Sequence, residues 1–238
     1  MEEIRDIVER IKEAQKMKSE SGKTSRTDGE PISQFEAQKK HEKLESCGIY
    51  KRFQNVTFQA IEKRGLPDDV LIRKNYAQVK DYVKNLAENI KRGYGLLLLG
   101  GYGTLKTTMA VAVLRAHIDA GGYGMFVPMC SLMDNLFTMR DLSREEWARY
   151  EKRVRSTPLL VLDDLGSEDT GRDWVRSKAD SIITERYNKM LPIIVTTNLT
   201  QDELLDTYSG RIVDRLRNTS RCLTFGTGSQ RRVLGESA

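Results

Sequence analysis

The sequence is poor in the residues that build disulfide scaffolds and metal centres. Its 238 residues include only 3 cysteines and 2 histidines. Cys47, Cys130 and Cys222 lie far apart and no Cys-x-x-Cys pair occurs, which argues against a disulfide framework and indicates a reducing compartment. His41 and Cys47 are close in sequence, but two ligands do not make a zinc site, so no structural zinc is expected.

Long apolar runs and a targeting segment are also missing. The apolar runs are too short to cross a bilayer, and the start of the chain, Met-Glu-Glu-Ile-Arg-Asp, has no apolar segment of the signal-peptide type. We therefore expect a cytoplasmic protein with no membrane partner. Hydrophobic residues make up 39% of the chain, enough for a sizeable core, and the net charge of +5 permits contact with nucleic acid without requiring it.

Residues 1–46 predict a small helical N-terminal region ahead of a main domain at 47–238. The apolar side chains of residues 2–18 recur at helical spacing and form one stripe: Ile4, Ile7, Val8 and Ile11. Residues 19–33 are polar and rich in Gly, Ser and Thr, as linkers are. We therefore favour a docking helix for a partner protein over a helix packed on its own domain. A basic helical stretch at 34–46 completes the region.

Strand and helix patterns alternate through most of the main domain. Apolar strands are expected at 96–99, 125–128, 159–162, 192–196 and 222–225. Helices are expected at 74–92, 107–120, 131–140, 143–155, 172–190 and 210–217. This alternation predicts an α/β fold with a mainly parallel sheet flanked by helices.

Capping residues support some of these helix starts. Ser131 is expected to cap the helix at 131–140. Ser143 with Glu146, and Thr200 with Glu203, have the spacing of a capping box.

A glycine-rich turn lies between the first strand and the next helix. We assign nucleotide binding to the whole turn: Gly100, Gly101, Tyr102, Gly103, Thr104, Leu105, Lys106, Thr107 and Thr108. In such a phosphate cradle, backbone N–H groups surround the phosphates, Lys106 reaches the terminal ones and the Thr107 hydroxyl ligates Mg²⁺. The alternative is an ordinary glycine-rich turn from strand to helix.

Leu105 departs from the pattern G-x-x-x-x-G-K-[ST], which otherwise fits Gly100, Lys106 and Thr107. A glycine at that position lets the backbone press against a phosphate, and a Cβ with an isobutyl group occupies that space. The chain therefore has the sequence pattern of a nucleotide-binding site, with Leu105 as the one residue that disfavours phosphate binding.

Two further polar groups follow apolar strands. Asp163 and Asp164 end the strand at 159–162, and Asn198 follows the strand at 192–196. The carboxyl ends of parallel strands share one sheet edge, where ligands bind in open α/β folds. In a P-loop enzyme Asp163 would hold Mg²⁺, Asp164 would orient and deprotonate the attacking water, and Asn198 would hold that water near the terminal phosphate. Alone, each is also compatible with a polar turn.

These three signals together resemble the AAA+ ATPases, and most closely the DnaC/DnaI-type helicase loaders and the IstB-type transposition helpers. Ser209–Arg217 resembles the segment that carries the arginine finger, and Ser229–Arg232 resembles the final arginine sensor. Cys47–Phe53 and Asn55–Phe58 resemble the entry segment before the ATPase core. The resemblance covers residues 45–234 and implies a P-loop AAA+ core that uses ATP and Mg²⁺.

The resemblance also implies roles for the arginines. Arg215 would be the finger and Arg231 the sensor, with Arg232 as the alternate. A guanidinium is planar and always protonated, so it stabilises negative charge that develops on a transferring phosphoryl group. Arg215 would act across a subunit interface, which predicts a nucleotide-dependent homo-oligomer. The alternative is a solvated basic helix face.

Residues 131–157 would, by the same resemblance, line a channel that binds single-stranded DNA. The basic residues of this region are Arg140, Arg144, Arg149, Lys152, Arg153 and Arg155. Phe137, Trp147 and Tyr150 are candidates for base stacking, but they fit a core equally well.

Three functions fit these observations. The first is an ATP-dependent replicative helicase loader that oligomerises, holds single-stranded DNA and docks on a ring helicase through its N-terminal region. The second is an IstB-like transposition helper ATPase, whose partner is a transposase. The third is a nucleotide-insensitive adaptor in which Leu105 has disabled the cradle.

Overall fold

The computed structural model describes residues 32–168, 173–226 and 228–229. The chain divides into two compact units, residues 1–41 and 42–238. The expected helix at 2–18 and nearly all of the expected linker lie outside the described residues. The helix expected at 34–46 is present within α2, Ile32–Ser46, while a domain boundary after residue 46 stays a prediction.

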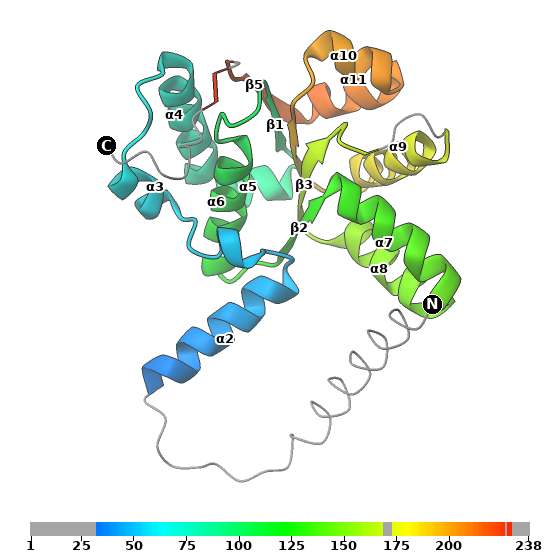
Figure 1. Cartoon of the computed structure of the whole chain (residues 1–238), viewed down its shortest axis with the longest axis horizontal. Helices are drawn as coiled ribbons and strands as arrows, with labels where there is room; N and C mark the ends of the chain where they lie inside the picture. The colour runs from blue at the N-terminus through cyan, green and yellow to red at the C-terminus, as the bar shows by residue number, and fades with distance from the viewer. Residues whose placement is uncertain (1–31, 169–172, 227, 230–238) are drawn as a thin grey trace. The chain divides into compact units, whose positions relative to one another are not determined.

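Five parallel strands form the sheet of the second unit, in the order β2-β3-β4-β1-β5 (Figure 1). The strands are β1 Gly95–Leu99, β2 Gly124–Pro128, β3 Leu159–Leu165, β4 Ile193–Thr197 and β5 Ser220–Thr224. The helices that follow α2 are α3 Phe58–Arg64, α4 Val70–Lys84, α5 Leu86–Lys91, α6 Lys106–Asp119, α7 Met129–Leu142, α8 Arg144–Ser156, α9 Asp173–Asn188, α10 Gln201–Thr207 and α11 Gly210–Asn218. The predicted α/β fold with a parallel sheet is confirmed.

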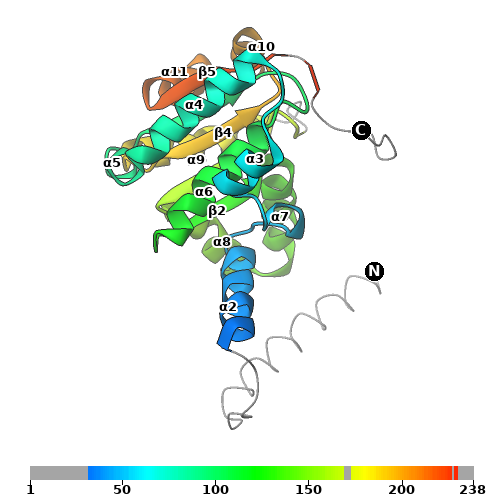
Figure 2. The ribbon, with the colours of Figure 1, turned by 90° about the vertical axis from the view of Figure 1, so that its left-hand side faces the viewer.

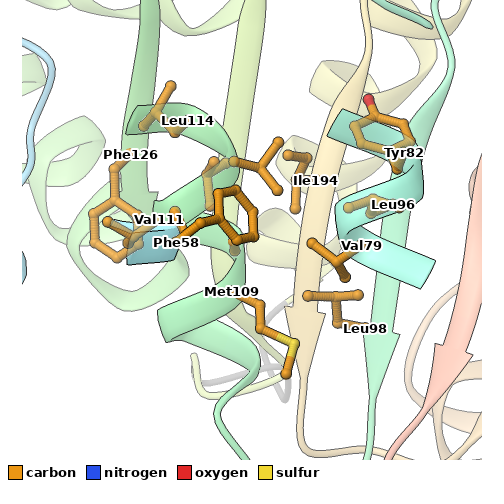
Figure 3. Packing of buried hydrophobic residues seen from close by; sticks show 14 of the residues in the cluster. Phe58, Val79, Tyr82, Leu96, Leu98, Met109, Val111, Leu114, Phe126 and Ile194 are labelled. Carbon is orange, nitrogen blue, oxygen red and sulfur yellow. The ribbon is translucent and has the colours of Figure 1, made fainter. Parts of the chain in front are cut away.

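Each strand supplies apolar side chains to both faces of the sheet. Leu96 and Leu98 of β1 belong to a buried cluster with α3, α4 and α6 (Figure 3). Leu97 and Leu99 belong to a second cluster, built with α7, α9 and α11. Figures 1 and 2 show α4 beside α6, and α7 beside α8. Burying one leucine contributes about 2 kcal/mol, so this two-faced core holds the sheet edges at fixed positions.

The helix expected at 74–92 is in fact two helices. Asp69 starts α4 early, because its carboxylate accepts a hydrogen bond from the backbone N–H of Ile72 at 2.9 Å. Asn85 ends α4 with φ −111° and starts α5. The Asn89 side chain then donates to the Tyr82 carbonyl at 2.9 Å and satisfies an end of α4.

The expected role of Ser131 as a helix cap is wrong, because α7 begins at Met129, directly after β2. The capping box of Thr200 and Glu203 is confirmed. Ser143 caps α8 by accepting from the backbone N–H of Glu146 at 3.3 Å. Within the described residues, no helix combines the length and the apolarity needed to cross a bilayer.

Candidate nucleotide-binding site

The carboxyl ends of β1, β3 and β4 meet at one edge of the sheet, which we call the carboxyl edge. Leu99 of β1 pairs with Thr197 of β4, and Thr197 pairs with Leu165 of β3. The glycine-rich turn after Leu99, the acids of β3 and Asn198 therefore come together, as predicted because the carboxyl ends of parallel strands share one edge.

The glycine-rich turn is held by the segment that follows β5. Phe225 N–H donates to the Leu99 carbonyl at 2.7 Å, and Gly101 N–H donates to the Gly226 carbonyl at 3.0 Å. A Cβ on Gly100, which has φ +136°, would lie 2.4 Å from the Phe225 carbonyl oxygen. Only glycine fits there, so this glycine maintains the close approach of the two backbones.

Leu105 occupies a backbone conformation that glycine usually takes. Its φ of 68° and ψ of 12° are left-handed, and it stands at the start of α6. That conformation costs a residue with a Cβ about 1–2 kcal/mol. The Leu105 side chain is partly buried and packs against the cluster of Figure 3. The structure therefore adds a backbone cost to the steric cost expected from the sequence.

Lys106 is folded into the turn and is only 6% exposed. Its Nζ donates to the carbonyls of Gly100 and Gly101, both at 2.7 Å, and to Oδ1 of Asn198 at 3.0 Å. The ammonium group is thus already at the centre of the turn, where the neutral oxygens of Gly100, Gly101 and Asn198 accept its hydrogen bonds. A phosphate oxygen, being charged, is a stronger acceptor than these oxygens.

The two acids lie on a β-bulge in β3. Leu162 pairs with Val195 and Leu165 pairs with Thr197, so Asp163 and Asp164 together oppose the single residue between Val195 and Thr197 on β4. Asp164 has φ +60°. Neighbouring side chains on a regular strand point to opposite faces, and a bulge re-aims one of them.

Asp163 and Asp164 have different partners. Thr196 Oγ1 donates to Asp163 Oδ1 at 2.6 Å, and Asn198 Nδ2 donates to Asp164 Oδ1. Burial raises the pKa of Asp163; hydrogen bonds from Thr196 and Thr107 oppose this rise without cancelling it. The Asn198 amide therefore connects Lys106 to Asp164, while Asp163 faces Thr107.

Thr107 and Asp163 fit a magnesium ion, because hydroxyl and carboxylate oxygens are ligands that Mg²⁺ prefers. Across the described part of the chain, no group of three or more His, Cys, Asp or Glu gathers into a metal site. A magnesium ion here would thus complete its coordination with water and substrate phosphates, as is usual for this ion.

Arg215 lies away from this edge. With Gly93 and Thr219, which precede β1 and β5, it lines a cavity of about 390 Å³ at the opposite, amino edge of the sheet. Its guanidinium stands 5.5 Å from the centre of the Tyr187 ring and donates to Thr184 Oγ1. It does not meet the glycine-rich turn of its own chain. Arg231 and Arg232 lie outside the described residues.

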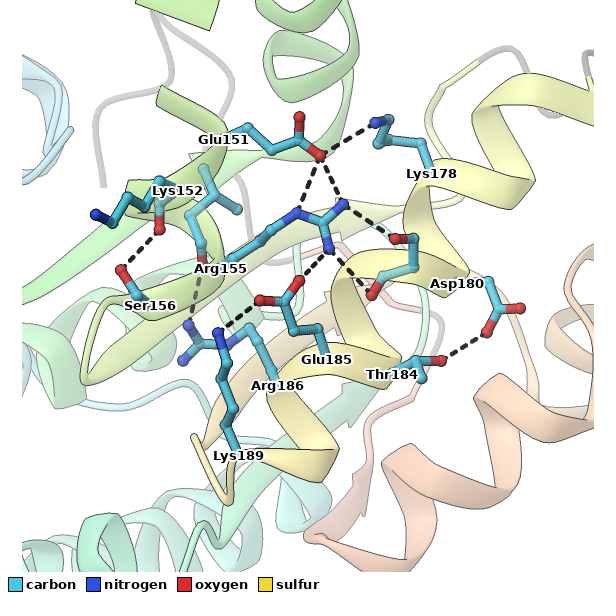
Figure 4. A network of polar contacts seen from close by, with 12 residues as sticks. Glu151, Lys152, Arg155, Ser156, Lys178, Asp180, Thr184, Glu185, Arg186 and Lys189 are labelled. Carbon is cyan, nitrogen blue, oxygen red and sulfur yellow. Dashed lines mark hydrogen bonds and ion pairs between the residues drawn. The ribbon is translucent and has the colours of Figure 1, made fainter. Parts of the chain in front are cut away.

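The expected DNA-binding region at 131–157 comprises α7 and α8, and its basic residues differ in availability. Arg155 is bound to Glu151 and Glu185 (Figure 4). Arg153 donates to the Ser46 carbonyl and to the Tyr123 hydroxyl. Arg144, Arg149, Lys152 and Arg153 are exposed, and the side chain of Arg140 lies outside the described part of the structure.

The aromatic residues of this region also differ. Phe137 is 57% exposed, whereas Trp147 and Tyr150 pack against the second core cluster. Of the three, only Phe137 keeps the exposure that base stacking needs.

Thr196 is a site residue that the sequence analysis missed. Its hydroxyl contacts both acids, as donor to Asp163 and as acceptor from the Asp164 N–H at 2.9 Å. The available signal was a buried polar residue at the end of an apolar strand, next to the strand that carries the acids.

The sheet order, the lysine-bearing turn after β1 and the acid pair on β3 define an AAA+ protein of the P-loop class. Comparison with known families agrees: residues 74–234 match the family of IstB-like ATP binding proteins. The chain belongs to that family.

Individual relatives carry replication and transposition names. The chain is 30% identical over 182 residues to the replicative helicase loader DnaI of Bacillus subtilis (strain 168), covering 74% of this chain and 56% of that protein. It is 29% identical over 150 residues to an ATP-binding protein of insertion sequence IS21 from Pseudomonas aeruginosa, covering 60% and 54%. The chain thus spans about half the length of the curated relatives it matches.

Among solved structures, the crystal structure of the DnaC helicase loader matches with a TM-score of 0.66 and 29% identity. The match covers 74% of this chain and 99% of that one. The AAA+ fold of the second unit is therefore shared with a helicase loader.

Proposed function

We propose that this protein is an ATP-dependent replicative helicase loader that binds ATP and Mg²⁺ at the carboxyl edge. One observation carries the nucleotide assignment: Lys106, Asn198 and Asp164 form a continuous hydrogen-bonded path beside Asp163. An accidental turn gives no reason for a buried lysine, an amide and two acids from three strands to converge.

The residues of the site have separate roles in binding and hydrolysing ATP. The N–H groups of Gly101–Thr108 and the start of α6 bind the phosphates, and Lys106 neutralises their charge. Asn198 holds a water, and Asp164 orients it and accepts its proton. Mg²⁺, held by Thr107 and Asp163, stabilises charge on the phosphates when it is bound.

Arg215 completes the site from a neighbouring subunit. Its place at the amino edge supports this assignment, because it lies away from the turn of its own chain. Nucleotide binding therefore favours assembly of a homo-oligomer, and Arg231 senses the phosphates as the second arginine.

The DNA and protein partners follow the same proposal. Single-stranded DNA contacts α7 and α8 through Arg144, Arg149 and Lys152, with Phe137 as the stacking residue. Residues 1–46 dock on the ring helicase. The similarity to DnaI and DnaC supports this reading.

Calorimetric titration with ATP and Mg²⁺ tests the nucleotide part. We expect micromolar binding by the natural chain and none by Lys106→Ala; equal affinity of the two proteins would overturn the assignment. Co-purification with a hexameric replicative helicase tests the loader part, and absence of binding in every nucleotide state would exclude it.

Two observations favour other functions. The IS21 relative supports a transposition helper, whose partner would be a transposase. The left-handed backbone of Leu105 supports a nucleotide-insensitive adaptor. ATP binding by the natural chain would exclude the adaptor, and binding to a transposase instead of a helicase would favour the helper.

A further inference from the structure

The bulge in β3 interrupts its pairing with β4 at the acids, while Asp163 keeps its pair with Pro128 of β2 on the other side. Asp163 and Asp164 face only Thr196 across the gap, so one residue of β4 must satisfy two residues of β3. A buried backbone N–H without an acceptor costs about 1–3 kcal/mol. Asp164 also holds φ +60°, a conformation that residues with a Cβ disfavour.

The Thr196 hydroxyl lies where the regular pairing of β3 with β4 is interrupted. It accepts from the Asp164 N–H at 2.9 Å and donates its proton to Asp163 Oδ1 at 2.6 Å. Thr196 is 1% exposed, so water does not replace these bonds freely. A hydroxyl supplies a donor and an acceptor at once, which a valine of the same shape does not.

We infer that Thr196 is the positioning residue that holds both carboxylates of the nucleotide site through this bulge. Its bond to Asp163 fixes the carboxylate that faces Thr107. Its bond to the Asp164 backbone keeps that residue left-handed, which turns the carboxylate toward Asn198. The functional part of this inference rests on the proposed ATP site, and its structural part does not.

Thr197 offers a matched control. It is 0% exposed, and its hydroxyl donates to the Leu165 carbonyl at 2.7 Å and accepts from the Leu199 N–H at 3.1 Å. Thr196→Val and Thr197→Val each delete one buried hydroxyl from the same strand. Only the first deletes a contact with the acids.

The first experiment compares crystal structures of Thr196→Val, Thr196→Ser and Thr197→Val without nucleotide. We expect Asp164 to leave its left-handed conformation and its bond to Asn198 in Thr196→Val, and to keep both in the other two variants. Retention of both features in Thr196→Val would overturn the inference. This result does not depend on ATP binding.

The second experiment measures steady-state ATP hydrolysis and its magnesium dependence. Loss of a residue that orients a metal ligand reduces metal affinity or activity by about 10- to 100-fold. We expect that loss in kcat and Mg²⁺ affinity for Thr196→Val, with KM for ATP changed by less than about 3-fold because the phosphate cradle is intact. Thr196→Ser should restore the activity, and Thr197→Val should retain it.

Equal kinetics for Thr196→Val and the natural chain would overturn the functional part. Equal losses for Thr196→Val and Thr197→Val would also overturn it, since they would show a general effect of strand stability. If the natural chain neither binds nor hydrolyses ATP, the proposed function fails, and the crystal structures alone decide whether Thr196 positions the acids.

Discussion

The two edges of the sheet use charge in different ways. At the carboxyl edge, Lys106 and Asp164 are joined through the neutral amide of Asn198, and no direct ion pair links them. At the amino edge, charged groups pair directly, as Arg155 does with Glu151 and Glu185 at 2.6 Å. Direct pairs bring opposite charges into contact within the chain, whereas at the carboxyl edge Lys106 and Asp164 each bond to the same neutral amide.

Arg186 is a charged residue of the amino edge that stabilises the fold. It is 0% exposed and donates to the Val154 carbonyl at 3.0 Å (Figure 4) and to the Pro192 carbonyl at 2.8 Å. Its burial lowers its pKa to about 9. An arginine held by backbone carbonyls ties α8, α9 and β4 together. We therefore expect changes at the amino edge to affect stability and changes at the carboxyl edge to affect nucleotide binding, with Arg215 as the exception.

Arg215→Ala tests that exception and has the largest expected effect. An arginine finger contributes about 10³-fold or more to phosphoryl transfer. We expect hydrolysis per assembled subunit to fall by that order while ATP affinity is retained, measured by phosphate release and calorimetry. Arg217→Ala, which removes an exposed arginine of the same helix, should change neither quantity.

Mixing variants separates action between subunits from action within one. Arg215→Ala retains the nucleotide site, and Lys106→Ala retains the finger. We expect the mixture to recover hydrolysis that neither protein has alone. No recovery in an assembled mixture would contradict a finger that acts across the interface.

Lys106→Ala is expected to be the next largest effect. A hydrogen bond to a charged group contributes about 1.5–3 kcal/mol, so ATP affinity should fall by about 100-fold or below detection. Lys189→Ala is the control at the amino edge, where Lys189 pairs with Glu185 at 2.6 Å. Loss of ATP affinity in Lys189→Ala would break the distinction between the edges.

Glu151→Gln tests stability at the amino edge. Burial raises the pKa of Glu151, but the hydrogen bonds and charges of Arg155 and Lys178 together outweigh it, so the pKa lies below its ordinary 4.5. The carboxylate therefore stabilises the fold fully above pH 4.5, and this stability is lost as the pH falls through the lowered pKa.

Urea unfolding at pH 7 should show a loss of about 1–3 kcal/mol in Glu151→Gln. The difference from the natural chain should shrink as the pH falls below 4.5. Glu145→Gln, on an exposed position of the same helix, should cost less than about 0.5 kcal/mol. A difference that does not change with pH would contradict the ion-pair explanation.

Leu105→Gly has the smallest expected effect, because it changes the free energy of unfolding in two opposite ways. Glycine removes about 1–2 kcal/mol of left-handed strain, and it loses about 1–2 kcal/mol of leucine packing. The melting temperature should therefore change little. ATP affinity should rise by about 5-fold, because the backbone N–H then approaches the phosphate more closely.

Leu105→Ala separates the effect of left-handed strain from the effect of side-chain packing. It keeps the Cβ and the left-handed strain but loses the packing, so we expect a lower melting temperature without a gain in affinity. Equal affinity of both variants and the natural chain would show that residue 105 does not contact the nucleotide.

Much of the fold followed from the sequence, because the strands are continuous apolar runs, as strands buried on both faces must be. The run at 159–162 predicted the start of β3, and the helix expected at 107–120 corresponds to α6. The break at Asn85 was missed, since the apolar spacing continues through it and the side chain of Asn89 decides where α4 ends.

The candidate site was predictable in its members and not in its geometry. Lys106, Asp163, Asp164 and Asn198 follow strands that the sequence placed at one edge. The bulge depends on pairing with Thr196, 32 residues further along the chain, and no local pattern encodes it. The left-handed backbone of Leu105 was likewise invisible in a helix-start pattern.

The bulge also restricts how the length of this segment can vary. Two residues of β3 span the space of one residue of β4, so deletion of either acid would restore regular pairing, with the remaining acid opposite Thr196 and Leu165 still opposite Thr197. Insertion of a residue would place three residues of β3 opposite the single Thr196 of β4. Homologous sequences that keep this site should therefore tolerate substitutions of the residues between Leu162 and Leu165 more readily than insertions or deletions there.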